Sequence, residues 1–305
     1  MLTHYVGYLK NMKNKYTLHQ GECLEIMEKE IDDNSIDLIL CDLPYGTTDR
    51  HGHKTEGRNR TIGWDNLIPL DMLWKQYKRI LNPEHGVVVL TADQPFTSQL
   101  VLSNLDWFKY EWIWKKRKTT GFLHANYRPM KQTEDILVFS PLGASAQSYK
   151  IGKCMRYNPQ GLIPMHKKKR NDPKRLGKIL HNPKFMGEGN KLLHDSVYEQ
   201  KWTNYPAEII EFGLERKTVH PTQKPVSLME YLIRTYSNEG DLILDNCMGS
   251  GTTGVATGKT NRHFIGIEMD EEYYRISEKR IKKSYSIAPI DNRFFFGTQL
   301  VLNLK

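Results

Sequence analysis

Short apolar segments rich in β-branched residues recur along this chain, and amphipathic segments lie between several of them. The apolar runs predict strands at residues 16–19, 36–41, 87–90, 110–114, 136–139, 242–244 and 263–268. Apolar residues at helical spacing predict helices at residues 70–81, 227–237 and 271–283. This alternation indicates an α/β fold with a mostly parallel, twisted sheet and helices on both faces. Ligands of such sheets bind beyond the carboxyl ends of the strands, where the winding reverses.

The periodic pattern fades in the middle of the chain. The segment there contains prolines, glycines and charges but few apolar residues at regular spacing. We therefore predict a first half of the fold at residues 1–140 and an inserted irregular region at residues 141–216. The second half and a C-terminal tail follow at residues 217–305.

The composition is typical of a soluble globular protein, with 39% hydrophobic and 26% charged residues over 305 positions. No apolar run approaches the roughly 18 residues of a membrane span, and the first 16 residues show no signal peptide. The four cysteines are far apart and form no CxxC pair. We therefore expect no disulfide, no metal site and a cytoplasmic location.

The net charge of +9 is concentrated in one part of the chain. Residues 141–219 contain 15 Lys and Arg against 7 Asp and Glu, which is +8 of that total. A basic segment between nearly neutral flanks suggests a polyanionic partner such as nucleic acid. A solvated, partly disordered insertion explains the composition equally well, so both interpretations stay open.

A glycine-rich turn follows the predicted strand at residues 242–244. Its glycines have the GxGxxG spacing at Gly249, Gly251 and Gly254. Glycine permits positive φ and lets the backbone approach a ligand closely, and Thr252 and Thr253 can satisfy free amides at the helix start. Glu268 ends the next predicted strand, where a carboxylate can accept hydrogen bonds from two ribose hydroxyls. A nucleoside-containing cofactor is the prediction, and a glycine-rich packing turn is the alternative.

The residues at the end of that strand bear on which cofactor binds. NAD would place its pyrophosphate on the helix N-terminus, whereas S-adenosylmethionine carries a sulfonium and an amino-acid tail. Asp245, beside Asn246, suits an ammonium group better than a pyrophosphate. This favours S-adenosylmethionine and leaves an NAD-dependent dehydrogenase as the rival interpretation.

A second strand ends in the tetrapeptide Asp42-Leu43-Pro44-Tyr45. The exocyclic amine of a nucleobase is a poor nucleophile because its lone pair is delocalised. The Asp42 carboxylate and the Leu43 carbonyl can accept the amine hydrogens, while Pro44 keeps the preceding residue extended and Tyr45 offers a ring for stacking. A base must leave the duplex to reach such a pocket. An ordinary Asp-x-Pro turn is the alternative.

Several other conspicuous residues have structural explanations. Cys41 lies inside an apolar run, so we expect a buried strand residue and not a catalytic thiol. We interpret His51 and His53 as solvent-exposed. We expect the tryptophans of one short segment to belong to the core and sheet: Trp107, Trp112 and Trp114.

Together these motifs resemble the amino-methylating DNA methyltransferases in which the catalytic motif precedes the cofactor loop. Asp42-Leu43-Pro44-Tyr45 is similar to their Asp/Ser/Asn-Pro-Pro-aromatic motif, and "DNCMGSGTTG" is similar to their glycine loop. "HPTQKP" (220–225) and "YTLHQGEC" (16–23) resemble two further family elements. The resemblance covers about residues 15–140 and 217–283 and implies a Rossmann-like methyltransferase fold.

The resemblance also implies which residues contact S-adenosylmethionine. "HPTQKP" would lie against its methionine end, Glu268 at the ribose and Glu22 near the adenine. The expected cofactor contacts are Glu22, Cys23, Asp42, His220, Thr222, Lys224, Asp245, Asn246, Cys247, Gly249, Ser250, Gly251, Thr252, Thr253, Glu268 and Met269. Two positions depart from the family pattern, since Leu43 replaces the usual first proline and Glu22 the usual Asp.

In the resembled family, the block between the two halves carries target recognition, so the basic insertion would bind double-stranded DNA. The expected DNA contacts are Arg117, Lys118, Lys167, Lys168, Lys169, Arg170, Lys174 and Arg175. The Asp-led motif favours adenine N6, with cytosine N4 as the alternative. A non-catalytic DNA-binding module, and methylation of RNA or of a protein glutamine, are less favoured. A homodimer and a partner restriction endonuclease are left open.

Overall fold

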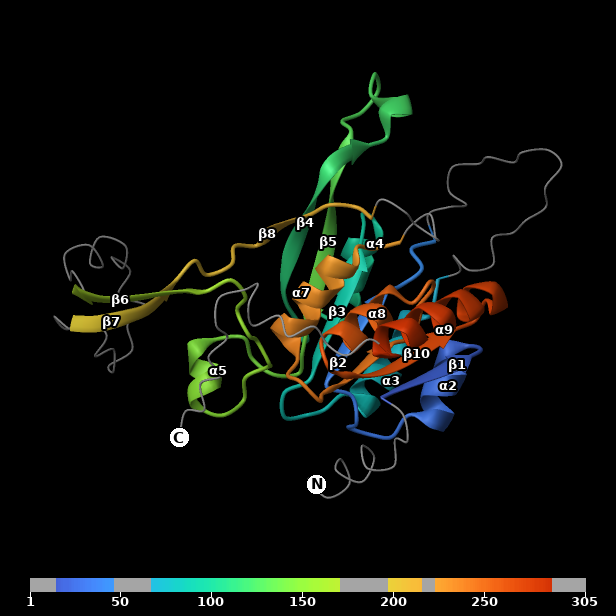
Figure 1. Cartoon of the computed structure of the whole chain (residues 1–305), viewed down its shortest axis with the longest axis horizontal. Coiled ribbons are helices and arrows are strands. Elements are labelled where there is room, and N and C mark those ends of the chain that lie inside the picture. Colours follow the sequence, from blue (N-terminus) through green and yellow to red (C-terminus); the bar gives the residue numbers. More distant parts are fainter. Residues whose placement is uncertain (1–14, 47–66, 171–196, 216–222, 287–305) are drawn as a thin grey trace. The chain divides into compact units, whose positions relative to one another are not determined.

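The structure of the protein is a computed structural model that describes residues 15–46, 67–170, 197–215 and 223–286 (Figure 1). It places eight of the described strands in one sheet. In spatial order these are β1 (Tyr16–Gln20), β10 (His263–Glu268), β9 (Leu242–Asp245), β2 (Leu38–Asp42), β3 (Val87–Ala92), β5 (Lys131–Phe139), β4 (Phe108–Thr120) and β8 (Ile209–Phe212). Strands β3, β5 and β4 pair in antiparallel fashion and the other pairs are parallel, so the predicted mostly parallel sheet is confirmed.

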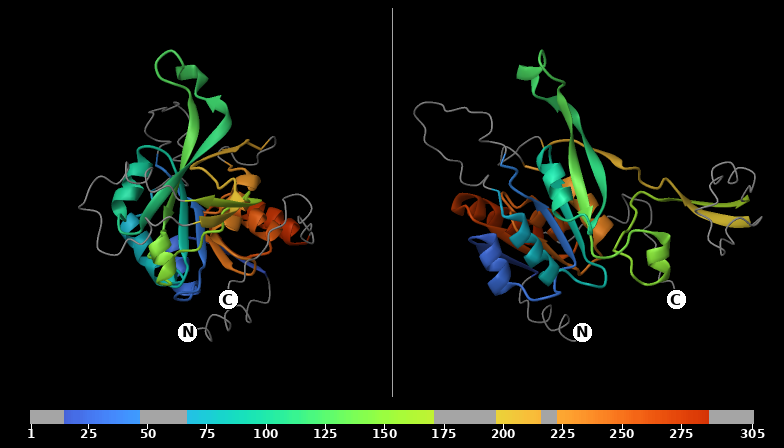
Figure 2. Two further views of the ribbon diagram at one scale, coloured as in Figure 1. Left: turned by 90° about the vertical axis from the view of Figure 1, so that its left-hand side faces the viewer. Right: turned by 180° about the vertical axis from the view of Figure 1, so that it is seen from behind.

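Helices cover both faces of this sheet, as predicted (Figure 2). One face packs against α2 (Cys23–Glu30), α3 (Leu70–Ile80) and α4 (Phe96–Ser103), and the other against α7 (Val226–Tyr236), α8 (Thr252–Lys259) and α9 (Glu271–Ser286). Successive strand residues alternate between the two faces. In β2, Ile39 and Cys41 belong to the first core, whereas Leu38 and Leu40 belong to the second.

The central pair of the sheet brings together the two segments that carry the motifs. Strand β2 lies parallel to β9, with Leu38 opposite Ile243 and Ile39 opposite Leu244. From this pair the chain winds in opposite directions, through β3 on one side and through β10 and β1 on the other. The pair is therefore the topological switch point of the sheet, and the carboxyl ends of both strands lie at the edge where ligands bind.

At the opposite edge of the sheet, where β2 begins, the buried carboxylate of Asp37 connects neighbouring segments by hydrogen bonds. Asp37 accepts hydrogen bonds from His85 at 2.7 Å, from Asn82 at 3.1 Å and from the Leu242 amide at 2.8 Å. His85, Asp37 and Asp241 are residue types that can bind a metal ion, and their ligand atoms lie close together. Since Asp37 already makes these contacts, the cluster joins the start of β2 to β9 and to the turn before β3.

The antiparallel part of the sheet extends beyond its core. Strand β4 contains the buried Trp112 and Trp114 and then continues to Thr120 with residues that are exposed except for Lys116. Together with β5 and a short 3-10 turn, η2 (Phe122–His124), it forms a hairpin that projects from the sheet (Figures 1 and 2). The sequence predicts only residues 110–114 of β4, because its outer part is held by cross-strand pairing and not by burial.

The region predicted as an irregular insertion contains regular elements. Strands β6 (Ile163–Arg170) and β7 (Val197–Thr203) form a separate antiparallel ribbon inside a compact unit, Pro159–Pro206. Helix α5 (Ala146–Lys150) and strand β8 belong instead to the larger unit, where β8 pairs with β4. The sequence misses the ribbon because a two-stranded, exposed ribbon needs no apolar alternation.

The predicted helices at residues 70–81, 227–237 and 271–283 correspond to α3, α7 and α9 and are confirmed. Cys41, Trp112 and Trp114 are buried as expected, and Trp107 packs against the first core. Burial raises the pKa of the Cys41 thiol to about 12, which excludes a thiolate nucleophile there near neutral pH. His51 and His53 lie outside the described residues. In the described part of the chain, every helix is too short or too polar to cross a membrane.

Candidate active site

The tetrapeptide after β2 forms one wall of a cavity. The Tyr45 hydroxyl lies 2.8 Å from Asp42 Oδ1, 3.1 Å from Thr91 Oγ1 and 3.2 Å from Glu134 Oε1. The Thr91 hydroxyl also donates to Asp42 Oδ1. Leu43 turns its side chain into the core at 3% exposure. The Tyr45 hydroxyl lies within hydrogen-bond distance of both carboxylates, and its single proton is donated to one of them at a time.

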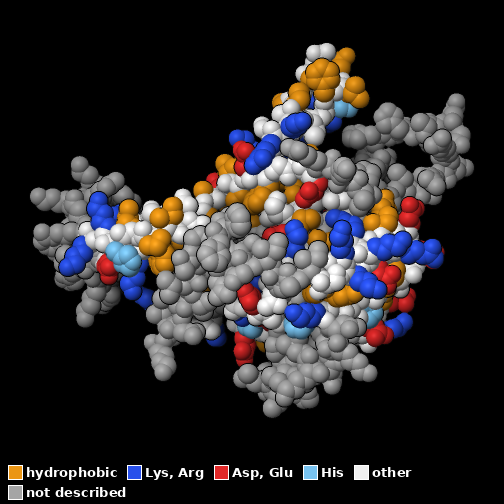
Figure 3. Space-filling view, viewed as in Figure 1, with side chains coloured by type: hydrophobic (Ala, Val, Ile, Leu, Met, Phe, Trp, Pro, Cys, Tyr) orange, Lys and Arg blue, Asp and Glu red, His pale blue; other side chains and the backbone are white. Residues whose placement is uncertain are grey.

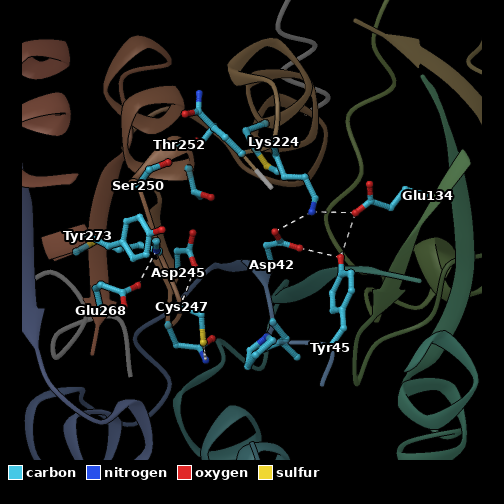
Figure 4. Close-up of a pocket in the computed structure, with 18 of the residues that line it drawn as sticks. Asp42, Tyr45, Glu134, Lys224, Asp245, Cys247, Ser250, Thr252, Glu268 and Tyr273 are labelled. Carbon is cyan, nitrogen blue, oxygen red and sulfur yellow. Dashed lines mark hydrogen bonds and ion pairs between the residues drawn. The ribbon is translucent and has the colours of Figure 1, made fainter. Parts of the chain in front are cut away.

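Two lysines complete this arrangement. Figure 4 shows one of them, Lys224, between Asp42 and Glu134. Lys224 Nζ lies 2.7 Å from Asp42 Oδ2 and 2.8 Å from Glu134 Oε1, and Lys116 Nζ lies 2.8 Å from Glu134 Oε2. We call Asp42, Tyr45, Thr91, Glu134, Lys116 and Lys224 the Asp42 cluster. Glu134 and Lys224 are both only 7% exposed. Formal charges therefore balance at two carboxylates against two ammonium groups.

Electrostatics within the Asp42 cluster favour the charged forms of Glu134 and Lys224 and the neutral form of Tyr45. Burial opposes ionisation of Glu134, but the ammonium groups of Lys224 and Lys116 outweigh burial and lower the pKa of Glu134 to about 2. Burial lowers the pKa of Lys224, and Asp42 and Glu134 reverse this, so that the net pKa is raised. Burial and the two carboxylates raise the pKa of Tyr45 well above its usual value, which keeps its hydroxyl protonated.

The end of β9 has a different electrostatic character. Asp245 is 3% exposed, and its Oδ1 accepts a hydrogen bond from the Cys247 amide at 3.1 Å. Burial raises the pKa of Asp245 to about 7, although hydrogen bonds from Thr253 and from that amide oppose the shift. A carboxylate in this state is stabilised by any cation that enters the cavity. Beside it, Asn246 accepts a hydrogen bond from the buried Tyr77 hydroxyl at 2.6 Å.

The three glycines of the loop serve two purposes. Gly249 has φ +50° and lines the cavity, with open space where a side chain would begin. At Gly251 (φ +78°) a Cβ would lie 2.8 Å from Ser277 Cβ, and at Gly254 it would lie 2.6 Å from Ile281 Cδ1. Gly249 therefore exposes backbone to a ligand, whereas Gly251 and Gly254 let α8 pack on α9. Gly251 does not line the cavity.

One expectation for this loop is wrong. Thr252 and Thr253 do not cap α8, since the residue at its start is Gly251 and no side chain makes a capping hydrogen bond. Both threonines are buried, and Thr253 turns its hydroxyl to Asp245. The left-handed conformation of Gly251 brings the chain into the helix without a cap.

Glu268 ends β10 on the far side of the cavity. The Gly249 amide donates to its Oε2 and the Asp270 amide to its Oε1, each at 2.8 Å. Burial raises the pKa of Glu268, and these two amides oppose the shift. Each oxygen keeps a second lone pair that a hydroxyl donor can use. Met269 and Tyr273 line the same side, and the sequence analysis did not identify Tyr273.

Glu22 and Cys23 lie at the start of α2 and line the same cavity. Glu22 Oε2 accepts a hydrogen bond from the Glu25 amide at 2.8 Å, so its carboxylate caps the helix. The cap gives Glu22 a structural function besides the expected one near the adenine. Ser250, also in the cavity wall, accepts a hydrogen bond from Arg280 at 2.9 Å.

A single cavity of about 500 Å³ joins the two strand ends, which is within the usual range for a small-molecule site. The cavity brings together most of the predicted residues: Glu22, Cys23, Asp42, Leu43, Pro44, Tyr45, Lys224, Asp245, Asn246, Cys247, Gly249, Ser250, Thr252, Thr253, Glu268 and Met269. Lys224 was expected at the methionine end of the cofactor, whereas its ammonium group lies against Asp42. Glu134 and Lys116 were not identified from the sequence, because isolated charges on the strands β5 and β4 carry no motif.

The predicted DNA contacts lie outside this cavity. Arg117 and Lys118 are exposed on the projecting hairpin, and Lys167, Lys168 and Lys169 are exposed on β6. Arg117 Nε lies 3.7 Å from Glu211. His220, Thr222, Lys174 and Arg175 lie outside the described residues, as does the side chain of Arg170.

Comparison with known proteins identifies the class. The N6/N4 methyltransferase family, described as "DNA methylase", matches residues 36–279, and the chain belongs to this family. Membership removes the NAD-dependent dehydrogenase alternative.

Individual relatives agree with this membership. The chain is 26% identical over 276 residues to the type II methyltransferase M.HpaI of Haemophilus parainfluenzae, covering 87% of this chain and 74% of the relative. It is 26% identical over 270 residues to the DNA adenine methyltransferase YhdJ of Escherichia coli, covering 87% and 82%. The fold resembles the crystal structure of the M1.HpyAVI–SAM complex, with TM-score 0.53, 21% identity, and 87% and 98% coverage.

Proposed function

We propose that this DNA methyltransferase moves a methyl group from S-adenosyl-L-methionine to N6 of an adenine flipped out of double-stranded DNA. Family membership gives the class of reaction. The observation that carries the assignment of residues is the shared cavity at the switch point, where the ends of β2 and β9 lie side by side.

The β9 side of the cavity fits the cofactor. Asp245 is a buried carboxylate that an ammonium group would stabilise, and Glu268 has lone pairs left for ribose hydroxyls. Gly249 leaves open space next to its backbone. When bound, the cofactor supplies an electrophilic methyl group on a sulfonium. Asp245, Gly249 and Glu268 would bind its amino-acid tail and nucleoside.

The β2 side fits the target amine. The Asp42 carboxylate and the Leu43 carbonyl would accept the two N–H groups, which localises the nitrogen lone pair for attack. As the N–C bond formed, the methyl–sulfur bond would break with its electron pair left on sulfur. Positive charge would develop on nitrogen, where the Asp42 carboxylate would stabilise it, and the amine would then lose one proton to water. The gain is one of orientation and electrostatics, because both acceptors are fixed at the end of a buried strand.

Glu134 has an electrostatic function in this arrangement. Lys224 and Lys116 are two positive charges beside a reaction in which positive charge develops on the amine. Glu134 contacts both ammonium groups, so Asp42 is not the sole counter-ion of Lys224. We infer that Glu134 is a positioning residue which keeps Asp42 available to the amine.

Adenine is proposed over cytosine because the motif begins with Asp42, and the Ser-led form is the commoner one for cytosine N4. The exposed lysines of β6, together with Arg117 and Lys118, support binding to the phosphate backbone. A homodimer and a companion restriction endonuclease stay predictions.

The proposal is tested by expressing the chain in a host whose DNA lacks methylated bases and sequencing the modified genome. We expect N6-methyladenine at one short motif, and none when Asp42→Ala is expressed at the same level. N4-methylcytosine at a motif would keep the reaction class and overturn the choice of base. The absence of any modified base, with no labelled methyl incorporated into DNA in vitro, would overturn the function.

A further inference from the structure

The tip of the β4–β5 hairpin exposes large apolar side chains. Phe122 is 79% exposed, Leu123 89% and Tyr127 87%, among the highest values for apolar residues in the described chain. Figure 3 shows hydrophobic side chains gathered at the end of the projecting hairpin, with Lys and Arg side chains on the same projection. A cluster of this kind on a solvent-facing projection indicates a contact with another molecule.

The backbone of this tip is ordered. The amides of His124, Ala125, Tyr127 and Arg128 donate to carbonyls within the turn at 2.9 to 3.0 Å. Gly121 begins the turn with φ +89°, a conformation that favours glycine. The three apolar side chains therefore extend from a turn that its own backbone hydrogen bonds hold in place.

The charge of the hairpin points to the kind of partner. Residues 115–131 include six Lys and Arg and no Asp or Glu. Lys115 and Arg117 have Glu211 nearby, and Lys116 and Lys131 pair with Glu134 and Asp93. Within the described residues, Lys118, His124 and Arg128 have no acidic partner. Cations around an apolar tip favour a polyanion over a second copy of this basic chain.

The hairpin is also adjacent to the site where a base must enter. Lys116 on β4, and Thr120 and Lys131 at the outermost strand pair just before the tip turn, line the same cavity as Asp42. A base that leaves a duplex abandons its stacking partners, and proteins that distort DNA often insert apolar side chains between base steps.

Resting on the proposed function, we propose that Phe122, Leu123 and Tyr127 form a wedge that enters duplex DNA beside the target and compensates for the lost stacking of the flipped base. Lys118 and Arg128 hold the flanking phosphates. The wedge belongs to the larger unit, which also contains the cavity, whereas the basic β6–β7 ribbon belongs to the other unit.

The test uses the methylated motif found by genome sequencing. Two duplexes carry the target base, one opposite its normal partner and one opposite an abasic site, where flipping costs less. The wedge variant combines Phe122→Ala, Leu123→Ala and Tyr127→Ala. The control combines Leu102→Ala and Leu105→Ala, which are 71% and 60% exposed and do not line the cavity.

We expect the wedge variant to methylate the normal duplex about tenfold more slowly or worse, and the abasic duplex within about twofold of wild type. Equal loss on both duplexes, or no loss on either, overturns the wedge. The control variant should match wild type, and all variants should keep the wild-type unfolding temperature and cofactor affinity. If the wedge variant changes the sedimentation mass of the protein, the tip is an interface between copies and the proposal is wrong.

The proposed phosphate contacts of Lys118 and Arg128 are tested by the salt dependence of DNA affinity. Lys118→Ala with Arg128→Ala should reduce the slope of log affinity against log salt by about 0.9 for each phosphate that is no longer neutralised, whereas the wedge variant should leave the slope unchanged. A wedge variant that alters the slope as much would overturn the assignment of roles. If wild type transfers no methyl group to DNA, the proposed function fails and the wedge fails with it. Normal wild-type activity with an unaffected variant rejects the wedge alone.

Discussion

The two acidic strand ends at the switch point occupy equivalent places in the fold and have opposite electrostatics. Asp42 belongs to a cluster of balanced charges, in which two lysines hold the pKa of Glu134 at about 2. Asp245 has no ion-pair partner among the described residues, and burial raises its pKa to about 7. The protein itself therefore neutralises the charge at the Asp42 end, whereas at the Asp245 end it leaves a charge for the ligand to neutralise.

The largest expected effect comes from the Asp42 side. Asp42→Ala removes the proposed acceptor for the amine, so the rate of methyl transfer should fall at least about 10²- to 10³-fold. Cofactor affinity, measured by calorimetry, should stay within a few-fold, because Asp245 and Glu268 are untouched. Turnover near the wild-type rate would show that Asp42 does not bind the amine and that the roles proposed for the two strand ends are wrong.

Glu134→Gln should give the next largest effect. Lys224 and Lys116 lose a shared counter-ion, so we expect kcat to fall about 10- to 100-fold with little change in KM for the cofactor. Removing one member of a buried ion pair also costs about 3–5 kcal/mol in the free energy of unfolding. Rapid-mixing kinetics and urea unfolding measure the two effects.

Glu211→Gln is the matched control for Glu134→Gln. Glu211 is about half exposed and lies near Lys115 and Arg117 on the same edge of the sheet. Exposed pairs contribute about 0–1 kcal/mol, so this variant should retain turnover and stability. Equal effects of the two substitutions would mean that Glu134 acts only as a structural residue.

The Asp245 side predicts a pH dependence. The cofactor ammonium prefers the ionised carboxylate, so cofactor affinity should fall as pH decreases through about 7, by up to about tenfold per unit below it. In the protein without ligand, Asp245 affects folding stability in the opposite direction, so stability falls as pH rises. The folded state binds more protons than the unfolded state between the usual aspartate pKa and 7, so this group destabilises the protein as pH rises through that window.

Asp245→Asn isolates this titration. The variant should bind cofactor weakly at every pH, with most of the pH dependence removed. Glu134 titrates too low to contribute, and Glu268, whose pKa burial also raises, accounts for any dependence that is left. Calorimetric titrations between pH 5.5 and 7.5, a window chosen to bracket the value of about 7, measure it. A variant that keeps the wild-type pH profile would assign the titration to another group.

The smallest effect is expected at Glu22, which caps α2 beside the cavity. Glu22→Asp should leave the unfolding temperature and cofactor affinity close to wild type, because Asp is also a good N-cap. Glu22→Ala should lose about 1 kcal/mol of stability. A large loss of cofactor affinity in Glu22→Asp would mean that the longer side chain contacts the cofactor directly.

Much of the fold was predictable because it depends on local pattern. Strands β2, β3, β9 and β10 are continuous apolar runs, as buried parallel strands require, and α3, α7 and α9 have clear amphipathic spacing. The GxGxxG loop and the Asp-Leu-Pro-Tyr turn were recognisable for the same reason, since each depends on consecutive residues.

The less predictable features depend on contacts between distant residues. Glu134 meets Lys224 across 90 positions, and Tyr77 meets Asn246 across 169, so neither pair leaves a local signal. The β6–β7 ribbon and the outer hairpin are polar and exposed, and hydrophobic periodicity does not detect them. The helix start at Gly251 contradicted the expected threonine cap, because backbone conformation replaced the side chain there.

By itself the sequence determined the central strands β2, β3, β9 and β10, the helices α3, α7 and α9, the two motifs at strand ends and the family, because each is written in short stretches whose chemistry is local. Only the tertiary structure decided that β2 and β9 are neighbours and that Lys224 lies against Asp42. It also decided that Asp245 is buried without an ion-pair partner among the described residues. These depend on burial and on distances between segments about 200 residues apart, and both are set by how the whole sheet packs.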